Sequence, residues 1–295
     1  MQENSEIKAL LQLIDDPDEE IYLTVSDKII SMGKDIIPNL EHLWENVSNE
    51  SIQERIEQLI HRLHFRDLSA DFDLWINTSG DLLSGSVIVA KYHHPDLQPN
   101  FVFQEIEKLR RNIWLELNNY LTPLEKINVM NSIFYNYYKQ TGVEINYENP
   151  DQFLINKTLE SKTGNAISNG IVYLILTHLL DIPVRAVNIP RQFLLAYFDD
   201  HFETMNPAGH PSQKILFYID PFSGQMYTHK DIEQYFKRLS VPPTSSFFRP
   251  MSNTKVIQFL IEEMSKCFDN DNNRYKMEEL SLLAQKITDK KDSKQ

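Results

Sequence analysis

The chain has 295 residues, of which 41% are hydrophobic and 24% charged, and its formal net charge is −13. These values are typical of a globular protein with room for more than one core, and the acidity argues against binding to nucleic acid through the phosphate backbone. One cysteine, Cys267, excludes an intrachain disulfide and a multi-cysteine metal site. Because no apolar run approaches the roughly 18 residues that span a bilayer and no export signal is visible, we expect a cytoplasmic protein without a membrane partner.

The first 66 residues are predicted to form short amphipathic helices joined by turns. Asp15-Asp16-Pro17 ends the first of these helices, because the residue before a proline leaves the helical region. Gly33 suits a helix C-terminus, and Pro38 suits the first turn of the next helix. Residues 10–21 resemble the first half of a HEAT repeat. We therefore expect a HEAT-like helical region over residues 1–66, which either caps the rest of the chain or offers a separate partner-binding surface.

Residues 67–100 carry a weaker pattern and are interpreted as a connecting segment, with at most a turn of helix near residues 81–90. The sequence His93-His94-Pro95-Asp96 superficially resembles a set of metal ligands. Adjacent histidines point in different directions on any regular element, and the sequence places no third ligand nearby. The prediction is therefore a surface loop, no metal site and no cofactor.

The middle of the chain is predicted to alternate helices with strands. Residues 101–118 and the segment after Thr122-Pro123-Leu124-Glu125 read as helices, the second reaching to near Gly142 and followed by a short helix to Glu160. A long apolar stretch after Gly164-Asn165 predicts a buried helix over residues 166–180. Runs of β-branched and aromatic residues predict strands at 184–188, 193–197 and 215–219, with a polar hairpin loop over 198–214. The pattern Thr228-x-x-Asp231 starts another helix, and more helices follow Pro242-Pro243.

The junctions of this central stretch are laid out as a three-residue active site would need them. A nucleophile at a helix N-terminus is activated by unpaired amides and the helix dipole. A base follows on a neighbouring strand, and an acid or amide on the next strand orients the base. The three corresponding places follow Asn165, follow Arg191 and coincide with Asp220.

Four motifs around those junctions resemble the transglutaminase-like superfamily, and most closely its bacterial SirB-type branch. They are 164–168 (GNAIS), 179–185 (LLDIPVR), 187–195 (VNIPRQFLL) and 219–222 (IDPF). The resemblance implies a helix-rich α+β fold, with a papain-like core in which a central helix packs on an antiparallel sheet. It also implies a helical N-terminal region and a tetratricopeptide-like C-terminal region. On this basis we place the core at residues 101–243 and the C-terminal helical region at 244–295.

The resemblance carries over to only one of the three site residues. Active members of the superfamily have cysteine where this chain has Ala166, and the SirB-type branch tends to lack that cysteine. The superfamily histidine falls at Gln192, and the acid is retained as Asp220. An alanine cannot act as a nucleophile, and a glutamine amide cannot shuttle a proton at neutral pH. The resemblance therefore implies a degenerate site.

Three further polar residues, Asn165, Ser168 and Asn188, are candidates for the cleft around these positions. Ser168 could in principle supply a hydroxyl nucleophile. Two residues along a helix rotate a side chain by about 200°, so Ser168 would not point where the cysteine points. No histidine stands behind it as a base. Structural roles also fit the other positions: Gln192 can hydrogen-bond a sheet neighbour or Asp220 itself, and Asp220 before proline can cap a turn.

Three functions stay open from the sequence. The first is a non-catalytic transglutaminase-like protein that binds a protein or peptide through its degenerate cleft or its helical flanks. The second is a hydrolase or amide transferase of the same superfamily that uses other residues. The third is a structural helical adaptor with a passive core. Neither the oligomeric state nor the partner follows from the sequence, and nucleic acid is not expected.

Overall fold

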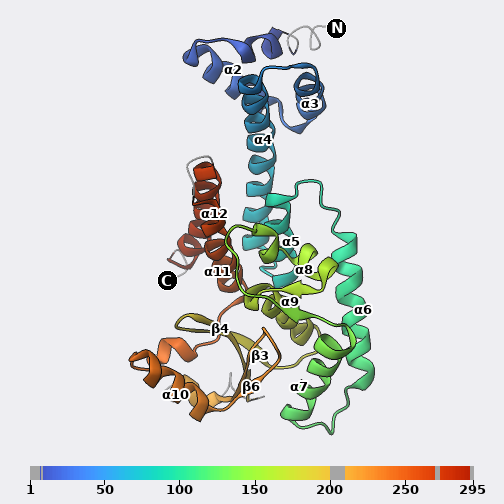
Figure 1. Cartoon of the computed structure of the whole chain (residues 1–295), viewed down its shortest axis with the longest axis vertical. Helices are drawn as coiled ribbons and strands as arrows, with labels where there is room; N and C mark the ends of the chain where they lie inside the picture. Colours follow the sequence, from blue (N-terminus) through green and yellow to red (C-terminus); the bar gives the residue numbers. More distant parts are fainter. Residues whose placement is uncertain (1–6, 8, 200–209, 270–272, 293–295) are drawn as a thin grey trace. The chain divides into compact units, whose positions relative to one another are not determined.

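The structure is a computed structural model that describes residues 7, 9–199, 210–269 and 273–292. The chain divides into two compact units, residues 1–72 and residues 73–295. Figure 1 shows the elements of both. The predicted boundaries at residues 66, 100 and 243 stay predictions, and each unit is described by itself below.

The first unit is helical, as predicted. It contains α2 (Glu19–Met32), α3 (Ile37–Asn46) and the first part of α4 (Glu50–Asn77). Asp18 caps α2 by accepting a hydrogen bond from the Glu20 amide, and Gly33 ends it with a φ of 81°. A left-handed φ of this kind favours glycine at a helix C-terminus. The unit has a hydrophobic core of its own, made by residues Ile14, Tyr22, Val25, Ile29, Ile36, Ile37, Leu40, Ile56, Leu59 and Leu63.

Residues 67–100, predicted as a connecting segment with a turn of helix near residues 81–90, are much more helical than that. Helix α4 continues to Asn77, and α5 (Leu82–His93) follows after a four-residue turn. Asp81 caps α5 through the Ser84 amide, and its pKa is lowered by hydrogen bonds to Ser84 and Ser79 that outweigh burial. Helix α5 is buried on several sides, so its sequence lacks the polar face from which an amphipathic helix is recognised.

Helices α6 (Asn100–Glu116) and α7 (Pro123–Asn131) follow, and Thr122 and Glu125 form the predicted capping box. The second helix was expected to reach Gly142, but it changes into a π-helix, η3 (Ser132–Tyr137). After it, β1 (Thr141–Gly142) pairs in parallel with β2 (Thr163–Gly164). Between these strands lie the 3₁₀ turn η4 (Pro150–Phe153) and α8 (Ile155–Ser161).

The central helix α9 (Ala166–Leu179) is buried from Ile167 to Thr177, as its apolar sequence predicted. Gly170 allows α9 to lie close to the sheet, because a Cβ at this position would be 2.6 Å from the Phe193 ring. Real Cβ contacts are not that short, so a side chain at residue 170 would push the helix away from the sheet.

The sheet has four antiparallel strands in the order β3-β4-β5-β6. Their bounds are β3 (Val184–Ile189), β4 (Gln192–Phe198), β5 (Ile215–Ile219) and β6 (Met226–Tyr227). The three longer strands confirm the strand predictions to within two residues. Of the predicted loop over 198–214, residues 211–214 form the 3₁₀ turn η5 (Pro211–Lys214), and residues 200–209 lie outside the described residues.

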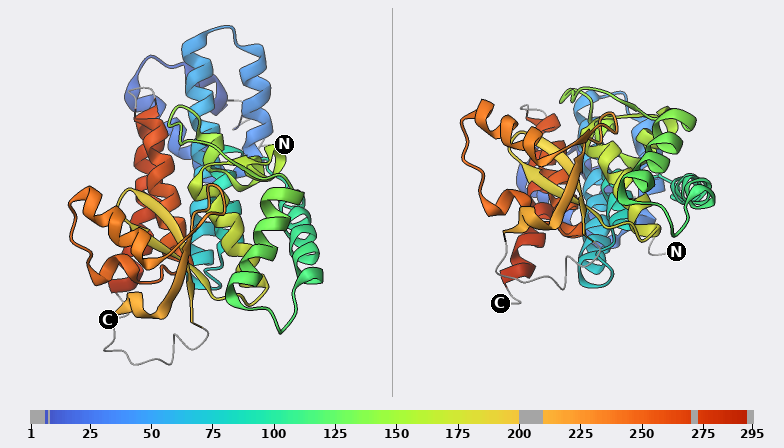
Figure 2. Two further views of the ribbon diagram at one scale, coloured as in Figure 1. Left: turned by 60° about the horizontal axis from the view of Figure 1, so that its bottom comes forward. Right: turned by 90° about the horizontal axis from the view of Figure 1, so that it is seen from below.

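Both faces of the sheet are covered, which explains why its strands are almost continuously apolar. Helix α9 packs on one face through Phe193, and α10 (His229–Leu239) and η6 (Ser245–Phe248) pack on the other through Ile232, Phe236 and Phe248. Figure 2 shows the strands between α10, in orange, and α9, in yellow-green. This arrangement confirms the expected α+β core.

The C-terminal region consists of α11 (Asn253–Ser265), the short turn η7 (Lys266–Phe268) and α12 (Arg274–Asp292). Within this region, α11 packs directly on the core. The Phe259 ring stacks on Phe193 with 5.4 Å between their centroids. A Cβ on Gly85 of α5 would also be 2.9 Å from Ile257. Residues of α11 therefore belong to the surroundings of the central helix.

Candidate functional site

Ala166 is the first residue of α9, at the helix N-terminus where the superfamily nucleophile would stand. The Asn165 side chain caps this helix by accepting hydrogen bonds from the amides of Ile167 and Ser168, at 2.9 and 3.0 Å. The Asn165 amide group donates to the Gln152 carbonyl at 3.1 Å, which ties the cap to η4. The helix start is thus held rigidly, with a methyl group in place of a thiol.

Gln192 stands at the start of β4, directly after a two-residue hairpin turn. Ile189 pairs with Gln192 across this turn, and Arg191 has a φ of 61°. Proline followed by a residue with positive φ is the combination that a type II turn requires. The turn leaves Gln192 exposed. Among the described residues, no hydrogen bond joins the Gln192 side chain to Asp220.

Asp220 closes the turn between β5 and β6. One of its carboxylate oxygens accepts a hydrogen bond from the Phe222 amide at 2.9 Å, so the side chain supports the turn as the sequence suggested. Burial raises the pKa of Asp220, and the nearby carboxylate of Glu144 raises it further. No described cation forms an ion pair with either carboxylate.

A cavity of about 600 Å³ brings the three positions together. Ala166, Gln192 and Asp220 all line it, and so does Asn188 from β3. Asn188, Gln192 and Glu144 are exposed, so the cavity opens to solvent as a cleft. The full lining comprises Val143, Glu144, Ile145, Tyr147, Ala166, Ile167, Asn188, Ile189, Arg191, Gln192, Phe193, Leu194, Asp220, Phe222, Phe259, Glu263 and Lys266.

Asn165 and Ser168, the other two candidates, are buried and do not line this cleft. A Cβ on Gly164 would lie 2.6 Å from the Ser168 hydroxyl oxygen, so this side chain points toward β2. The neighbouring Asn169 accepts a hydrogen bond from the Gln140 amide at 2.8 Å, within the same buried polar group. The structure therefore brings four of the six sequence candidates together.

One wall of the cleft is a segment that the sequence did not single out, residues 143–147. The Val143 amide donates to the Gly164 carbonyl at 3.0 Å, which extends the β1–β2 pairing past its last residue. Gly142 lies against the turn that carries Asp220, since a Cβ there would be 2.2 Å from the Phe222 carbonyl oxygen. These contacts bring Glu144 near Asp220. Because β1 and β2 have only two residues each, no sequence pattern predicts their pairing or the position of Glu144 beside Asp220.

Another part of the rim comes from α11 and the turn η7. Glu263 accepts a hydrogen bond from the Tyr147 hydroxyl at 2.7 Å and pairs with Lys266 at 2.6 Å. Burial and this hydrogen bond raise the pKa of Tyr147 to about 12. Phe259, Glu263 and Lys266 are spaced at i, i+4 and i+7, so one helical face carries them. This spacing could have indicated from the sequence that the three residues share a helix face, but not that this face meets the core.

The described residues of the cleft include neither a thiol nor an imidazole. Cys267 follows the rim residue Lys266 but does not line the cavity. Burial, with a smaller effect of Glu263, raises the pKa of the Cys267 thiol to about 11. The thiolate, which is the nucleophilic form, is therefore scarce at neutral pH.

The arrangement of a helix N-terminus, a strand start and an acidic turn around one cleft agrees with a comparison to known families. The family model described as the transglutaminase-like superfamily matches residues 100–262, which is more than half of the chain. The chain belongs to the transglutaminase-like superfamily. This match ends within α11, so the matched segment includes the cleft residue Phe259.

Similar proteins place this transglutaminase-like chain in the SirB-type branch. Protein SirB1 of Salmonella typhimurium LT2 is 23% identical over 199 residues, which cover 66% of this chain and 68% of that protein. UPF0162 protein YchA of Escherichia coli K12 is 22% identical over 206 residues, covering 69% and 71%. A UPF0162 protein of Xylella fastidiosa Temecula1 is 28% identical over 131 residues, covering 43% and 45%. No solved structure matches the chain.

Outside the cleft, the described residues contain one group that could hold a metal ion: His93, His94 and Asp151. The expectation that no third ligand lies near the two histidines was therefore wrong. Asp151 is 57 residues further along the chain, yet its carboxylate lies 2.9 Å from the His94 ring nitrogen Nε2. In the part of the chain that the structure describes, no helix has the length and apolar character needed to cross a membrane.

Proposed function

We propose that this transglutaminase-like protein is not a cysteine-type enzyme and instead binds a peptide segment of a partner protein in its cleft. The observation that carries the proposal is that Ala166, Gln192 and Asp220 line one solvent-open cavity of about 600 Å³. A degenerate site that served only the fold could have filled with larger side chains. A persisting cavity of this size lies within the range of about 300–1,000 Å³ that ligand sites occupy.

The chemistry of the three positions supports binding over catalysis. The methyl group of Ala166 has no proton to lose and no lone pair with which to attack a carbonyl carbon. Gln192 is uncharged at neutral pH and its amide cannot take up a proton there. Asp220 alone could act as a base, but neither a thiol nor an imidazole accompanies it among the described cleft residues. The helix N-terminus beside Ala166 still presents partial positive charge to a carbonyl oxygen of a bound chain.

The charges of the cleft favour a ligand with a cationic group. Glu263 is already compensated by Lys266, whereas Asp220 and Glu144 have no described ion-pair partner. A lysine or arginine side chain of a bound peptide would relieve the repulsion between these two carboxylates. The aromatic rings of Phe222 and Phe259 offer contact area for the apolar stem of such a side chain. We therefore expect a basic peptide segment.

Binding to an immobilised library of random peptides tests this function. The wild-type protein should retain peptides enriched in lysine or arginine at one position, and replacing that residue by norleucine should weaken binding at least about tenfold. Ala166→Trp should abolish binding by filling the cleft. Asp220→Asn and Glu144→Gln should each weaken it, and Glu148→Gln, an exposed acid that does not line the cleft, should not.

Two results would contradict the proposal. Retention of the same peptides by the wild-type protein and by Ala166→Trp would show that they bind elsewhere, and a library without enriched peptides would show that the cleft binds none. Mass spectrometry of the recovered peptides separates binding from an unrecognised activity. Intact, unmodified peptides are expected, whereas cleavage or a mass change that Ala166→Trp abolishes would establish an enzyme.

A further inference from the structure

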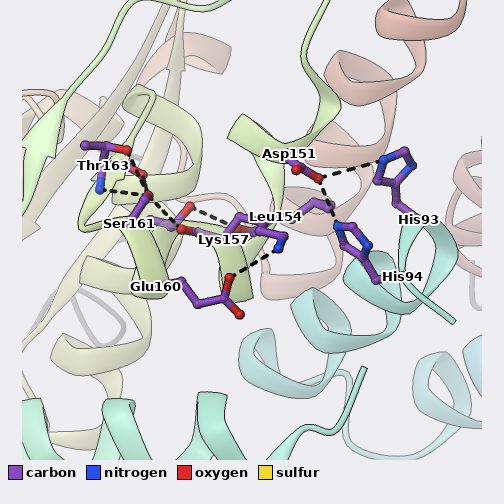
Figure 3. A network of polar contacts seen from close by, with 9 residues as sticks. His93, His94, Asp151, Leu154, Lys157, Glu160, Ser161 and Thr163 are labelled. Carbon is purple, nitrogen blue, oxygen red and sulfur yellow. Dashed lines mark hydrogen bonds and ion pairs between the residues drawn. The ribbon is translucent and has the colours of Figure 1, made fainter. Parts of the chain in front are cut away.

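Two adjacent histidines and one aspartate meet at the end of α5. His93 is the last residue of that helix, His94 follows it, and Asp151 comes from the turn η4. Figure 3 shows both imidazole rings pointing toward the Asp151 carboxylate. The Oδ1 atom of Asp151 is 2.9 Å from the His94 Nε2 atom and 3.8 Å from the His93 Nε2 atom.

The rings can converge because the helix ends between them. His93 still has helical backbone geometry, but His94 has a φ of −124° and a ψ of 80°. On a continuous helix, neighbouring side chains point about 100° apart. The change of backbone conformation at His94 turns its ring back toward that of His93, and the ring centroids are 4.9 Å apart. Adjacent side chains diverge on a regular helix or strand, but His93 and His94 lie where the helix ends, so their rings can converge.

The distances are close to those of a metal centre. The three candidate ligand atoms all lie within 4.8 Å of one another. Around a tetrahedral zinc ion, with bonds of about 2.0–2.2 Å, ligand atoms are roughly 3.3 Å apart. The two distances from Asp151, 2.9 and 3.8 Å, bracket that value. The two histidine nitrogens are within 4.8 Å of each other, so side-chain shifts of about 1 Å would complete the geometry.

We propose that His93, His94 and Asp151 form a binding site for a divalent transition-metal ion, and that Zn²⁺ suits this set best. Two imidazoles and one carboxylate are a ligand set that zinc uses when one position is left to water. Harder ions such as Mg²⁺ and Ca²⁺ prefer oxygen ligands, and this group offers them only one carboxylate. None of its three residues lines the cleft, and the site does not depend on the proposed peptide function.

A metal ion can reach the three ligands from solvent, and the neighbouring lysines do not compete with it for them. The side chains of His93, His94 and Asp151 are 26%, 33% and 40% exposed, so an ion can enter from solvent. Of the nearby cations, Lys157 pairs with Glu160 at 3.2 Å and Lys276 lies over the Phe268 ring at 5.6 Å. Among the described residues, the Asp151 carboxylate pairs with the two histidines and with no lysine, so ligation would displace no lysine.

Metal binding at this place would brace the start of the central helix. Asp151 is followed by Gln152, whose carbonyl accepts the Asn165 amide and whose side chain accepts the Asn146 amide at 3.0 Å. One of these bonds holds the cap of α9, and the other holds the segment that precedes the cleft residue Tyr147. An ion that fixes Asp151 to the end of α5 therefore stabilises both the cap of α9 and the segment before Tyr147.

Titration of the full chain with Zn²⁺ against a chromophoric chelator tests the site, with Co²⁺ as a spectroscopic probe. The wild-type protein should bind a single equivalent of Zn²⁺, and Zn²⁺ should raise its melting temperature. Mg²⁺ and Ca²⁺ should have neither effect. Co²⁺ should give the strong visible absorption of a tetrahedral site. His93→Ala, His94→Gln and Asp151→Asn should each weaken Zn²⁺ binding by more than about 100-fold, since removing a hydrogen-bond partner of a ligand already costs about 10–100-fold.

His178→Ala is the matched control, because His178 is an exposed histidine at the other end of α9 and belongs to no such group. Unchanged Zn²⁺ affinity in this variant, with loss in the other three, supports the site. Equal affinity in all four variants overturns it, since binding would then be nonspecific. If the ligand variants fail to fold, the wild-type spectrum decides: Co²⁺ without tetrahedral absorption leaves only a hydrogen-bonded histidine–aspartate pair.

Discussion

Gly142 lies so close to Phe222 that a Cβ on residue 142 would be 2.2 Å from the Phe222 carbonyl oxygen. This contact joins the segment that carries Glu144 to the turn that carries Asp220, although 80 residues separate the two in sequence. The obstacle is a backbone atom, which cannot rotate out of the way as a side-chain tip can. The shape of the cleft thus depends on a glycine that lies outside the degenerate triad.

Gly142→Ala should destabilise the protein by about 2–3 kcal/mol, the upper part of the range for a group forced into a packed site. Urea unfolding followed by circular dichroism measures the change. Asn119→Ala, on the exposed loop between α6 and α7, serves as the control and should change the free energy of unfolding by less than about 0.5 kcal/mol. A Gly142→Ala variant as stable as this control would show that the two segments are not packed as described.

The pKa of Asp220 predicts how its replacement changes stability with pH. Burial and Glu144 raise this pKa above its ordinary value of 3.8, so the folded state holds the proton more tightly than the unfolded state. The contribution of Asp220 to stability is then fully present below pH 3.8 and is lost as the pH rises through the folded-state pKa. Asp220→Asn keeps the acceptor for the Phe222 amide and removes the charge.

We therefore expect Asp220→Asn to be more stable than the wild type at pH 7, with a difference that shrinks as the pH falls toward 4. Urea unfolding of both proteins across this range measures it. Glu148→Asn, at an exposed acid just after the segment that carries Glu144, should show no such trend. A variant less stable than the wild type at neutral pH would mean that the Asp220 carboxylate is stabilised by a contact that Asn cannot make.

The sequence predicted the elements around the cleft well because each has a strong local signal. The apolar stretch of α9, the turn at Gly164-Asn165 that precedes it and the three longer strands follow from hydrophobicity, turn residues and β propensity. What could not be predicted depends on long-range packing. The short parallel pairing that places Glu144, the α11 face that supplies Phe259, and the meeting of Asp151 with His94 all join residues far apart in the chain.

Two local predictions failed for a different reason. Helix α5 was missed because it is buried on several sides and so has no polar face to reveal its period. The helix after Thr122 was expected to stay regular, but it widens into the π-helix Ser132–Tyr137. Tyr135 of this segment donates to the Pro221 carbonyl at 2.8 Å, so the irregular turn serves a contact beside Asp220.

Asn165 and Ser168 should affect stability to very different degrees. Asn165 is fully buried, caps two amides of α9 and donates to Gln152, so Asn165→Ala should cost about 2–3 kcal/mol, more than an exposed cap. The Ser168 hydroxyl makes only a 3.4 Å bond to the Asn165 carbonyl, and Ser168→Ala should cost less than about 1 kcal/mol. Thermal and urea unfolding compare them.

Asn165→Asp is an informative third variant in that series. It keeps the acceptor for the Ile167 and Ser168 amides but loses the donor to the Gln152 carbonyl. Its stability should fall between those of the wild type and Asn165→Ala. Equal losses for Asn165→Ala and Ser168→Ala would contradict the assignment of the cap to Asn165, and with it the rigid start of α9.

The last prediction concerns thiols placed at the degenerate site. Ala166→Cys puts a thiol at the N-terminus of α9 and beside the open cleft, whereas the native Cys267 is half-buried with a pKa of about 11. In a Cys267→Ser background, the thiol at residue 166 should react with iodoacetamide at pH 7.5 at least about tenfold faster than Cys267 does in the wild type. Adding Gln192→His should raise the rate further if the two positions still face each other.

Ser168→Cys in the same background is the matched control, because residue 168 is only 2% exposed and points toward Gly164. Equal rates at residues 166 and 168 would mean that the cleft does not open at the helix start, which removes the basis for peptide binding there.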